Sequence, residues 1–595
     1  MKLFRVMTIS LLLVSHAVAS QSARGRIEGI VLQAGSVNPQ PVVGARITVT
    51  KVNASTGASF LVPGRTAGTS ITTGPTTPFP GLPAPGQRGT PPPPPGAPTL
   101  QQMALPIPPV TTGRDGRFVA PDLEEGSYRV LVTQDGYVRQ EYGQRVFPGQ
   151  GTLITLGAGQ VFRDMTIRLI ETGNLGGRIF DNSGRPAVGV PLQLLKAIYN
   201  QTGQRIFQNA GTARTNDRGE YRFFWVTPGR YYLGGGNAAA NYSFGGANTS
   251  PNEPGDTFTL TFYPGVTDIG RATAIDVKSG SEAVFDFAVP RQQLFSISGK
   301  IVNPSPAAAD GNVPAATISL AFQTLTGSTG VFQMQQAYDP ATGLFVLRDV
   351  LPGAYILQAA APPFSARVPV EITNSNVENL AVVIDGGVNI NGRFIVDGGE
   401  MPPANTMQIQ MRLVSNGLQN YSGSSATSQA VAADGSFSIP GVLPGEYRIV
   451  VPPSQDFYVK EIRYDRRDAL NGPVPVCCSS DAGTIEVIIN RSVGQLDGVI
   501  VDDRSQPVAG VQAVLIPDAR NRTELYKTAT TDQTGNFVMR GVTPGDYKLF
   551  AWEALENFGY FDPDQMRRSE SSGKAVRVAE SSKLVVEGKI IPAER

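Results

Sequence analysis

Apolar and polar residues alternate in many short stretches along this chain. Clear examples are residues 165–169, 285–289 and 485–489, in which every second side chain is apolar. Successive side chains of a strand point to opposite faces of a sheet, so this alternation predicts strands that bury one face. Beyond the first 19 residues we find no long stretch with the apolar spacing of an amphipathic helix. The pattern therefore predicts an all-β protein.

The alternating stretches belong to a motif that occurs five times. In each copy a glycine precedes an aromatic residue by two positions, and ten positions later a second glycine stands two before a tyrosine. Identical spacing in every copy predicts that one small β module has been repeated along the chain. The glycine, glycine and tyrosine of the successive copies are Gly116, Gly126 and Tyr128; Gly219, Gly229 and Tyr231; Gly343, Gly353 and Tyr355; Gly435, Gly445 and Tyr447; and Gly535, Gly545 and Tyr547.

Each copy is interpreted as a β-hairpin whose conserved spacing is structural. The first glycine is expected in a turn, where it adopts positive φ without steric cost. The second glycine follows proline in four copies, a pair that predicts a type II turn. The tyrosine then starts the return strand, with its ring in the core and its hydroxyl at the rim or on a backbone acceptor.

A further glycine opens a strand upstream of each hairpin, at positions 29, 177, 299, 392 and 498. The intervals suit sandwiches of about 100 residues with roughly seven strands. We therefore predict a tandem array of about five β-sandwich modules after a signal peptide. The predicted segments are a signal peptide at 1–19, module 1 at 24–170 with a Pro-rich insertion at about 62–110, module 2 at 171–291, module 3 at 292–385, module 4 at 386–492 and module 5 at 493–592.

The N-terminus has the three parts of a secretory signal peptide. Lys2 and Arg5 precede an apolar run to Val14, and residues 17–19 offer a small-x-small cleavage site. No later stretch is long and apolar enough to predict a membrane span. We expect export to the periplasm, the cell surface or the medium, with no transmembrane segment after cleavage.

Charge and histidine content exclude several classes of function. The chain has 50 basic and 49 acidic residues, a balance that argues against a nucleic-acid partner. Its one histidine, His16, lies inside the predicted signal peptide, which excludes histidine-based catalysis and histidine-ligated zinc. We predict a non-enzyme with no catalytic residues, no cofactor and no metal, although a carboxylate-only or Ser-Lys site stays open.

The two cysteines, Cys477 and Cys478, are adjacent. They are interpreted as two thiols or one local bridge, because an exported fold that depended on disulfides would contain more cysteines. No CxxC spacing or second ligand cluster accompanies them.

The repeat resembles the carboxypeptidase regulatory-like domain, a transthyretin-like or Ig-like β-sandwich close in fold to carbohydrate-binding domains. The resemblance rests on residues 41–45, 215–221 with 228–233, and 531–537 with 544–549. It implies an accessory module of exported bacterial proteins and not a peptidase, whose zinc-binding histidines this chain lacks.

Departures from the repeat supply the candidate binding residues. Five aromatics of module 5 are expected on or beside its outer face, and two more lie in the Gly/Asn/Ser-rich loop of module 2. The module 5 group could stack on sugar rings, contact a protein, or be buried by its own loop. Trp225 is assigned to the edge of the core. The candidate residues are Phe550, Trp552, Phe558, Tyr560 and Phe561 in module 5, and Tyr242 and Phe244 in module 2.

The Pro-rich insertion favours extended polyproline II and has little to bury. A surface loop, a spacer and a docking ligand remain open as interpretations.

Taken together, the sequence predicts an exported, non-catalytic interaction or structural protein. The alternative is a carbohydrate-binding protein that uses the module 5 aromatics or the module 2 loop. The expected partner is a polysaccharide or another envelope protein.

Overall fold

The computed structural model describes residues 23–35, 38–52, 107–144, 147, 151–237, 256–302, 317–323, 329–333, 338–339, 342–361, 364–414, 425–427, 431–477 and 483–593. The chain forms two compact units, one of Met1–Gln144 with Gly149–Ile170 and one of Arg145–Pro148 with Glu171–Arg595. The predicted signal peptide, the Pro-rich insertion up to residue 106, Tyr242, Phe244 and Cys478 lie outside the described residues.

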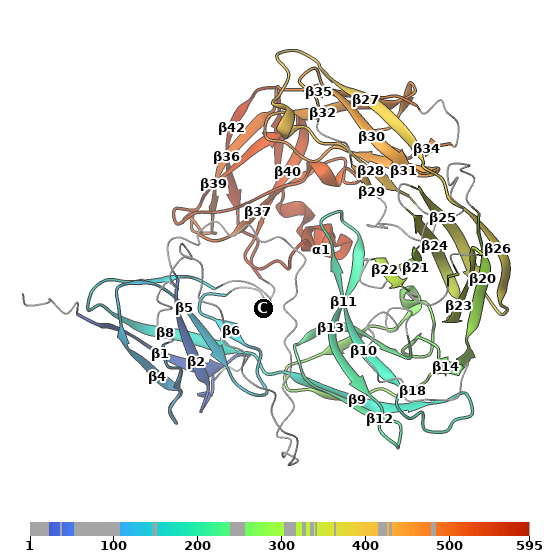
Figure 1. The fold of residues 1–595 in the computed structure, drawn as a ribbon. Coiled ribbons are helices and arrows are strands. Elements are labelled where there is room, and N and C mark those ends of the chain that lie inside the picture. The colour runs from blue at the N-terminus through green and yellow to red at the C-terminus, as the bar shows by residue number, and fades with distance from the viewer. Residues whose placement is uncertain are drawn as a thin grey trace, which may run out of the picture. The chain divides into compact units, whose positions relative to one another are not determined.

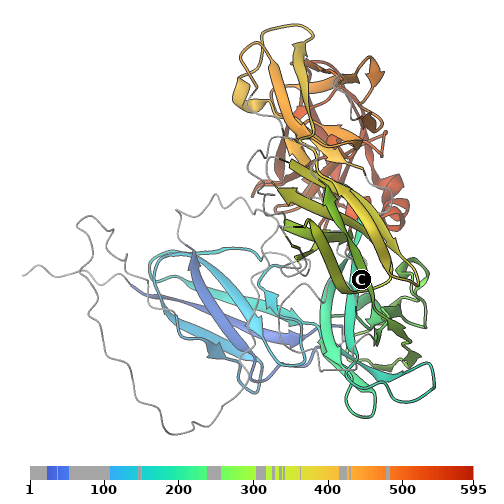
Figure 2. The ribbon, with the colours of Figure 1, turned by 45° about the vertical axis from the view of Figure 1, so that its right-hand side comes forward.

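The first unit is a sandwich of two sheets, drawn in blue in Figures 1 and 2. In one sheet the central strand β1 pairs antiparallel with β4 and parallel with β8. In the other, β2 and β5 are neighbours and β3, β6 and β7 flank them. The strands are β1 Gly25–Gln33, β2 Arg46–Val52, β3 Val110–Thr111, β4 Arg117–Leu123, β5 Gly126–Thr133, β6 Gln140–Glu141, β7 Ile154–Leu156 and β8 Val161–Leu169.

Module 2, in the second unit, repeats this plan. Strand β9 lies between β12 and β17, and β10 lies between β11 and β13 in the facing sheet. The elements are β9 Gly173–Phe180, β10 Pro191–Tyr199, β11 Arg205–Arg214, β12 Glu220–Val226, β13 Gly229–Gly235, β14 Asp256–Phe258, β15 Thr261–Phe262, η3 Ile269–Arg271, β16 Ile275–Val277, β17 Glu282–Val284, β18 Phe287–Ala288 and β19 Arg291–Gln293.

Modules 3 and 4 follow the same order of strands. Strand β20 lies between β23 and β26, and β27 lies between β30 and β35. The elements of module 3 are β20 Phe295–Val302, β21 Thr317–Gln323, β22 Thr329–Gln333, β23 Leu344–Val350, β24 Gly353–Ala361, β25 Phe364–Ile372 and β26 Val377–Val383. Those of module 4 are β27 Val388–Val396, η4 Ala404–Thr406, β28 Gln410–Leu413, β29 Ser425–Thr427, β30 Ser436–Val442, β31 Gly445–Val450, β32 Tyr458–Tyr464, β33 Arg467–Asp468, β34 Val474–Val476 and β35 Ile485–Asn490.

Module 5 adds the α-helix α1 to the shared plan. Strand β36 lies between β39 and β42, and β37 pairs with β38 and β40. The elements are β36 Gly494–Val501, β37 Gln512–Pro517, η6 Thr523–Leu525, β38 Lys527–Thr530, β39 Asn536–Val542, β40 Gly545–Trp552, η7 Gly559–Phe561, α1 Pro563–Ser569, η8 Glu570–Ser572, β41 Lys574–Val578 and β42 Lys583–Lys589.

Each pair of sheets encloses its own apolar core, and each core draws on one module alone. In module 1, for example, Ile27 and Met165 of the first sheet pack with Ile47 and Val130 of the second. Equivalent clusters fill the other four modules. The protein is thus an all-β tandem array of sandwiches, as the alternation of apolar residues predicted.

The hairpin glycines confirm one prediction and correct another. The first glycine of every copy has φ between +72° and +82°, as a turn position requires. The second glycine has φ between +148° and +159°, whereas a type II turn needs about +80° at that position. The predicted type II turn is therefore wrong, although the position still favours glycine.

The repeated tyrosines are buried and anchor the hairpin. All five rings are between 1% and 3% exposed. Each hydroxyl donates to the carbonyl oxygen four residues earlier, at 2.7–2.8 Å. This is the arrangement of a tyrosine corner, and it confirms the predicted core position and backbone acceptor.

The upstream glycine and the first aromatic of each copy are cross-strand partners. The pairs are Gly29 with Phe118, Gly177 with Tyr221, Gly299 with Phe345, Gly392 with Phe437 and Gly498 with Phe537. A Cβ atom at Gly498 would lie 2.5 Å from the Phe537 ring and 2.5 Å from the carbonyl oxygen of Val586. The two residues recur together because the ring occupies the space that a side chain at the glycine would need.

Every copy also contains a β-bulge that the alternation did not reveal. The residue six positions after the first glycine has φ between +57° and +65°, and the strand register shifts beside it. The extra residue turns the next apolar side chain into the core. The bulge residues are Asp122, Trp225, Asp349, Gly441 and Gly541, and the core residues after them are Leu123, Val226, Val350, Val442 and Val542.

Candidate functional site

The aromatic group of module 5 is not an exposed patch. Phe550, Trp552 and Tyr560 are 1%, 3% and 5% exposed and form a small core with Met566 of α1. The Phe550 and Trp552 rings stack with centroids 5.3 Å apart. The loop between β40 and β41 folds over the outer face of β37 and β40. The prediction of a sugar or protein platform here is therefore wrong, and burial by the loop is what the structure shows.

The β10–β11 hairpin covers the edge of this cluster. Lys196 forms an ion pair with Glu556 at 2.5 Å, and a Cβ atom at Gly203 would lie 3.0 Å from the Phe561 ring. Figure 1 shows the tip of the β10–β11 hairpin beside α1. Phe558 and Phe561 are accordingly half-buried, which leaves no open aromatic platform on module 5.

A different aromatic pair is exposed, on the outer face of module 2. Phe224 and Trp225 are 59% and 61% exposed, so the assignment of Trp225 to the core edge is wrong. Period two places Trp225 on the face of Tyr221 and Phe223, but its φ of +57° forms the bulge and turns its side chain outward. Its amide donates to Asn174 Oδ1 at 3.3 Å.

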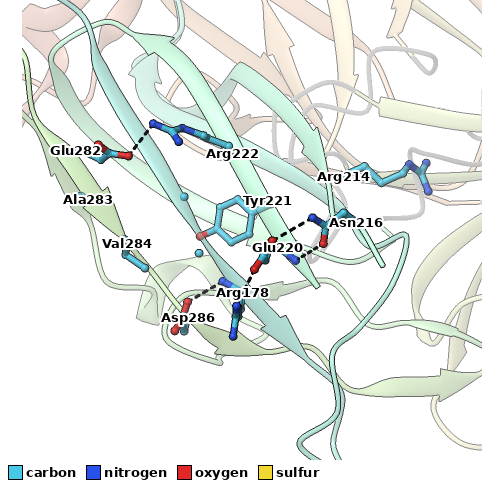
Figure 3. Close-up of a pocket in the computed structure, with 12 residues that line it drawn as sticks. Arg178, Arg214, Asn216, Glu220, Tyr221, Arg222, Glu282, Ala283, Val284 and Asp286 are labelled. Atoms are coloured by element: carbon cyan, nitrogen blue, oxygen red, sulfur yellow. Dashed lines mark hydrogen bonds and ion pairs between the residues drawn. The ribbon is translucent and has the colours of Figure 1, made fainter. Parts of the chain in front are cut away.

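A shallow trough of about 590 Å³ lies on the same sheet. Arg222 lines it, and its guanidinium carbon lies 5.0 Å from the centroid of the Phe224 ring. The floor of the trough is the central strand β9 at Gly176 and Gly177, where no side chain fills the outer face of the sheet. Val284 lies beside Gly176 in the neighbouring strand β17. The volume is within the range of small-molecule pockets, about 300–1,000 Å³. Figure 3 shows the side chains that surround it.

Two ion pairs frame the trough. Arg222 Nη2 lies 2.7 Å from Glu282 Oε1, and Arg178 Nη2 lies 2.7 Å from Glu220 Oε1. Arg222 is opposite Gly176 on one side of β9, and Glu282 is beside Asn174 on the other, so the first pair spans the central strand. Figure 3 shows both pairs.

Hydrogen bonds from Arg178 and Asn216 hold the pKa of Glu220 below its usual value, and the bond from Arg178 has the larger effect. Glu220 is therefore ionised at neutral pH. Asp286 Oδ1 accepts the backbone amide of Arg178 at 2.7 Å. With Arg214 at the rim, the lining carries three arginines and three carboxylates. The trough thus offers fixed donors and acceptors with no net charge.

Tyr221 lies under the floor and is held in one role. Its hydroxyl donates to the carbonyl oxygen of Phe285 at 2.7 Å, and burial raises its pKa well above the usual 10.0. The hydroxyl therefore remains neutral at physiological pH and makes a hydrogen bond that supports the fold.

Within the described ranges, no cluster of three His, Cys, Asp or Glu side chains could hold a metal ion. The arrangement suits binding of a polar ligand.

Sequence comparison between the copies carried a signal that could have revealed this face. Trp225 occupies the position that holds aspartate in modules 1 and 3 and glycine in modules 4 and 5. Glycine and aspartate are common at positive φ, whereas a bulky residue such as tryptophan is rare there. The two glycines at 176–177 are a second departure, because the chain has one glycine at this step in the other copies.

Two predictions concern residues outside this face. Cys477 is exposed with a free thiol. In the described part of the chain, no helix has the length and apolar character to cross a membrane.

No family model and no curated protein matches the chain. Partly similar solved structures include GBS52, the minor pilin of Streptococcus agalactiae, with 14% identity over 45% of this chain and 96% of that chain and a TM-score of 0.21. The RrgB pilus protein of Streptococcus pneumoniae is 10% identical over 71% of this chain and 99% of that chain, with a TM-score of 0.15. The shaft pilin SpaA of Lactobacillus rhamnosus GG is 11% identical over 46% and 98%, with a TM-score of 0.18. The assignment of the fold rests on the strand pairing described above.

Proposed function

We propose that this chain is an exported, non-catalytic sandwich array of the carboxypeptidase regulatory-like kind. It acts as an interaction or structural protein at the cell surface or in the periplasm. One observation carries the proposal: module 2 exposes two large aromatic side chains next to a polar trough on an open sheet face. Exposed aromatic surface beside polar groups is typical of a binding face.

Three features favour binding over catalysis. The chain has one histidine, and it lies in the predicted signal peptide. The trough carboxylates Glu220 and Glu282 are each paired with an arginine, and the pKa of Glu220 lies below its usual value, whereas a general acid needs a raised pKa. The Tyr221 hydroxyl is committed to a backbone carbonyl. These groups fix the orientation of a ligand and supply no activated nucleophile.

Carbohydrate binding is the second candidate function. Burial of the module 5 aromatics removes one basis for it, and the module 2 loop with Tyr242 and Phe244 lies outside the described residues. The exposed pair and the trough on the sheet face of module 2 now support it instead.

Co-sedimentation with the cell envelope tests the proposal. The mature chain, residues 20–595, is mixed with an envelope fraction of the producing cells, and bound protein is measured in the pellet. We expect the wild type to sediment and the double variant Phe224→Ser, Trp225→Gly to remain in solution. Val585→Ser is the matched control, because Val585 is an exposed apolar residue of module 5, at 82% exposure. Equal sedimentation of wild type and double variant would contradict the proposed binding face.

A further inference from the structure

We infer that the module 2 face binds a neutral glycan, with a sugar ring on Trp225 and its hydroxyl groups over the trough. This inference rests on the proposed function and adds the chemical class of the ligand. Three independent features of the face support it: the backbone conformation of Trp225, the balance of charge in the trough, and the continuity between the aromatic and polar parts.

Trp225 is held in a conformation that disfavours its own side chain. Its φ of +57° is in the left-handed region, where the Cβ atom of a bulky residue meets the adjacent backbone. Modules 4 and 5 place glycine at this position and modules 1 and 3 place aspartate, so the bulge itself does not need tryptophan. With 61% of its surface exposed, the side chain adds little to the core. Strain of this kind persists where a residue is needed for function.

The trough offers paired donors and acceptors and no net charge. Three arginines and three carboxylates line it, which suits neither a polyanion nor a cationic ligand. Guanidinium and carboxylate groups at fixed spacing match adjacent hydroxyl groups of a sugar, which both donate and accept. Gly176 leaves the strand surface flat, so a ring can lie close to the backbone. Neutral, polyhydroxylated ligands fit this lining.

The aromatic and polar parts are one surface. The guanidinium carbon of Arg222 lies 5.0 Å from the centroid of Phe224, and the same guanidinium is paired with Glu282 at 2.7 Å. Asn174, which accepts the Trp225 amide, is next to Glu282 across the strands. A ligand on the Phe224 ring therefore reaches the charged pair without crossing another element, and Trp225 is the next residue of the chain.

Native affinity electrophoresis of the mature chain tests the inference. Gels contain glycogen, dextran, xyloglucan or galactomannan as the soluble neutral polymer, and mobility is compared with a polymer-free gel. We expect at least one polymer to retard the wild type. Trp225→Gly should weaken that binding at least tenfold, while its melting temperature stays equal or rises because the strain is removed. Glu282→Gln should also weaken binding, since it removes a charged acceptor.

The matched control is Asp349→Gly, which makes the same change of backbone freedom at the bulge of module 3. It should leave retardation unchanged. Absence of retardation in all four gels, or equal retardation of wild type and Trp225→Gly, would overturn the inference. If the envelope pellet still captured wild type and not the Phe224/Trp225 double variant, the binding function would stand and the glycan assignment would fail. Loss of that capture after protease treatment of the envelope would then identify a protein partner.

Discussion

Thr112, Thr215 and Thr531 occupy the same place in modules 1, 2 and 5, four residues before the first glycine of the repeat. Each buried hydroxyl donates to a backbone carbonyl at 2.6–2.8 Å and accepts a backbone amide at 2.8–2.9 Å. The hydroxyl thus joins the loop after the first strand to the start of the hairpin. Modules 3 and 4 carry aspartate and valine there, so this bond is a variable part of the repeat.

Replacing Thr531 by valine should destabilise module 5 by about 1–3 kcal/mol, because the Val508 carbonyl and the Val511 amide lose their buried partner. Hydrogen exchange of module 5 peptides in the full chain measures the change. Thr528→Val is the control: Thr528 is exposed on β38, and its replacement should shift stability by less than about 0.5 kcal/mol. Equal effects of the two substitutions would show that the buried hydroxyl contributes nothing.

The buried tyrosines predict a loss of stability in alkali. Burial raises the pKa of Tyr355, Tyr547 and Tyr560 from the usual 10.0 to about 12. Folding therefore favours the neutral phenol, a contribution that is fully present below pH 10 and is lost as pH rises towards 12. We expect denaturant midpoints to be constant between pH 7 and 9 and to fall steeply above pH 10. A midpoint that does not change up to pH 12 would contradict the buried hydroxyls.

At the level of elements, the hairpins could be predicted because period-two alternation and turn glycines are local signals. The bulge could not, since one extra residue moves the following side chains to the opposite face and the alternation alone does not mark it. The alternation therefore predicts an inward Trp225, whereas the bulge turns this side chain outward. Helix α1 was also missed, although Asp562 caps it and Pro563 occupies its first turn, a start signal in the sequence.

The aromatics of module 5 show a limit of a different kind. Phe550 and Trp552 do face away from the main core, as alternation predicts. Their burial depends on the loop after β40, which contributes Tyr560 and Met566 from further along the chain. Contacts of this sort are set by tertiary packing, so the pattern within one strand could not distinguish an exposed face from a covered one.

Because the upstream glycine is paired with an aromatic ring, we predict that any side chain at that glycine destabilises the module. Gly498→Ala should destabilise module 5 by about 1–3 kcal/mol, because its Cβ would overlap Phe537 and the Val586 carbonyl. Urea unfolding followed by hydrogen exchange gives the change. Gly472→Ala is the control, since its position has open space and an ordinary φ. A tolerated Gly498→Ala would contradict the reason given for the repeated pair.

At the scale of the whole molecule, one sandwich plan is repeated, and small departures from it decide which surfaces of each module are buried or exposed. Modules 2 and 5 both bury a second apolar cluster on the outer face of the sheet that contains the return strand of the hairpin. Module 2 in addition places the exposed Phe224 and Trp225 on β12 of its other sheet. The plan itself could be recognised from the spacing of the repeated residues, because the glycines, aromatics and tyrosines occupy positions that the backbone geometry of the hairpin requires. The binding face could not, because it depends on which positions depart from the plan.

Hydrogen exchange on the intact mature protein tests the repeated sandwich most directly. The central strands β1, β9, β20, β27 and β36 each lie between two hydrogen-bonded neighbours, so their amides should all be among the slowest to exchange. Five separate regions of strong protection, one in each predicted module, are the expected result. Rapid exchange in any of these strands, at the rate of an unprotected chain, would contradict a sandwich with its own core at that place.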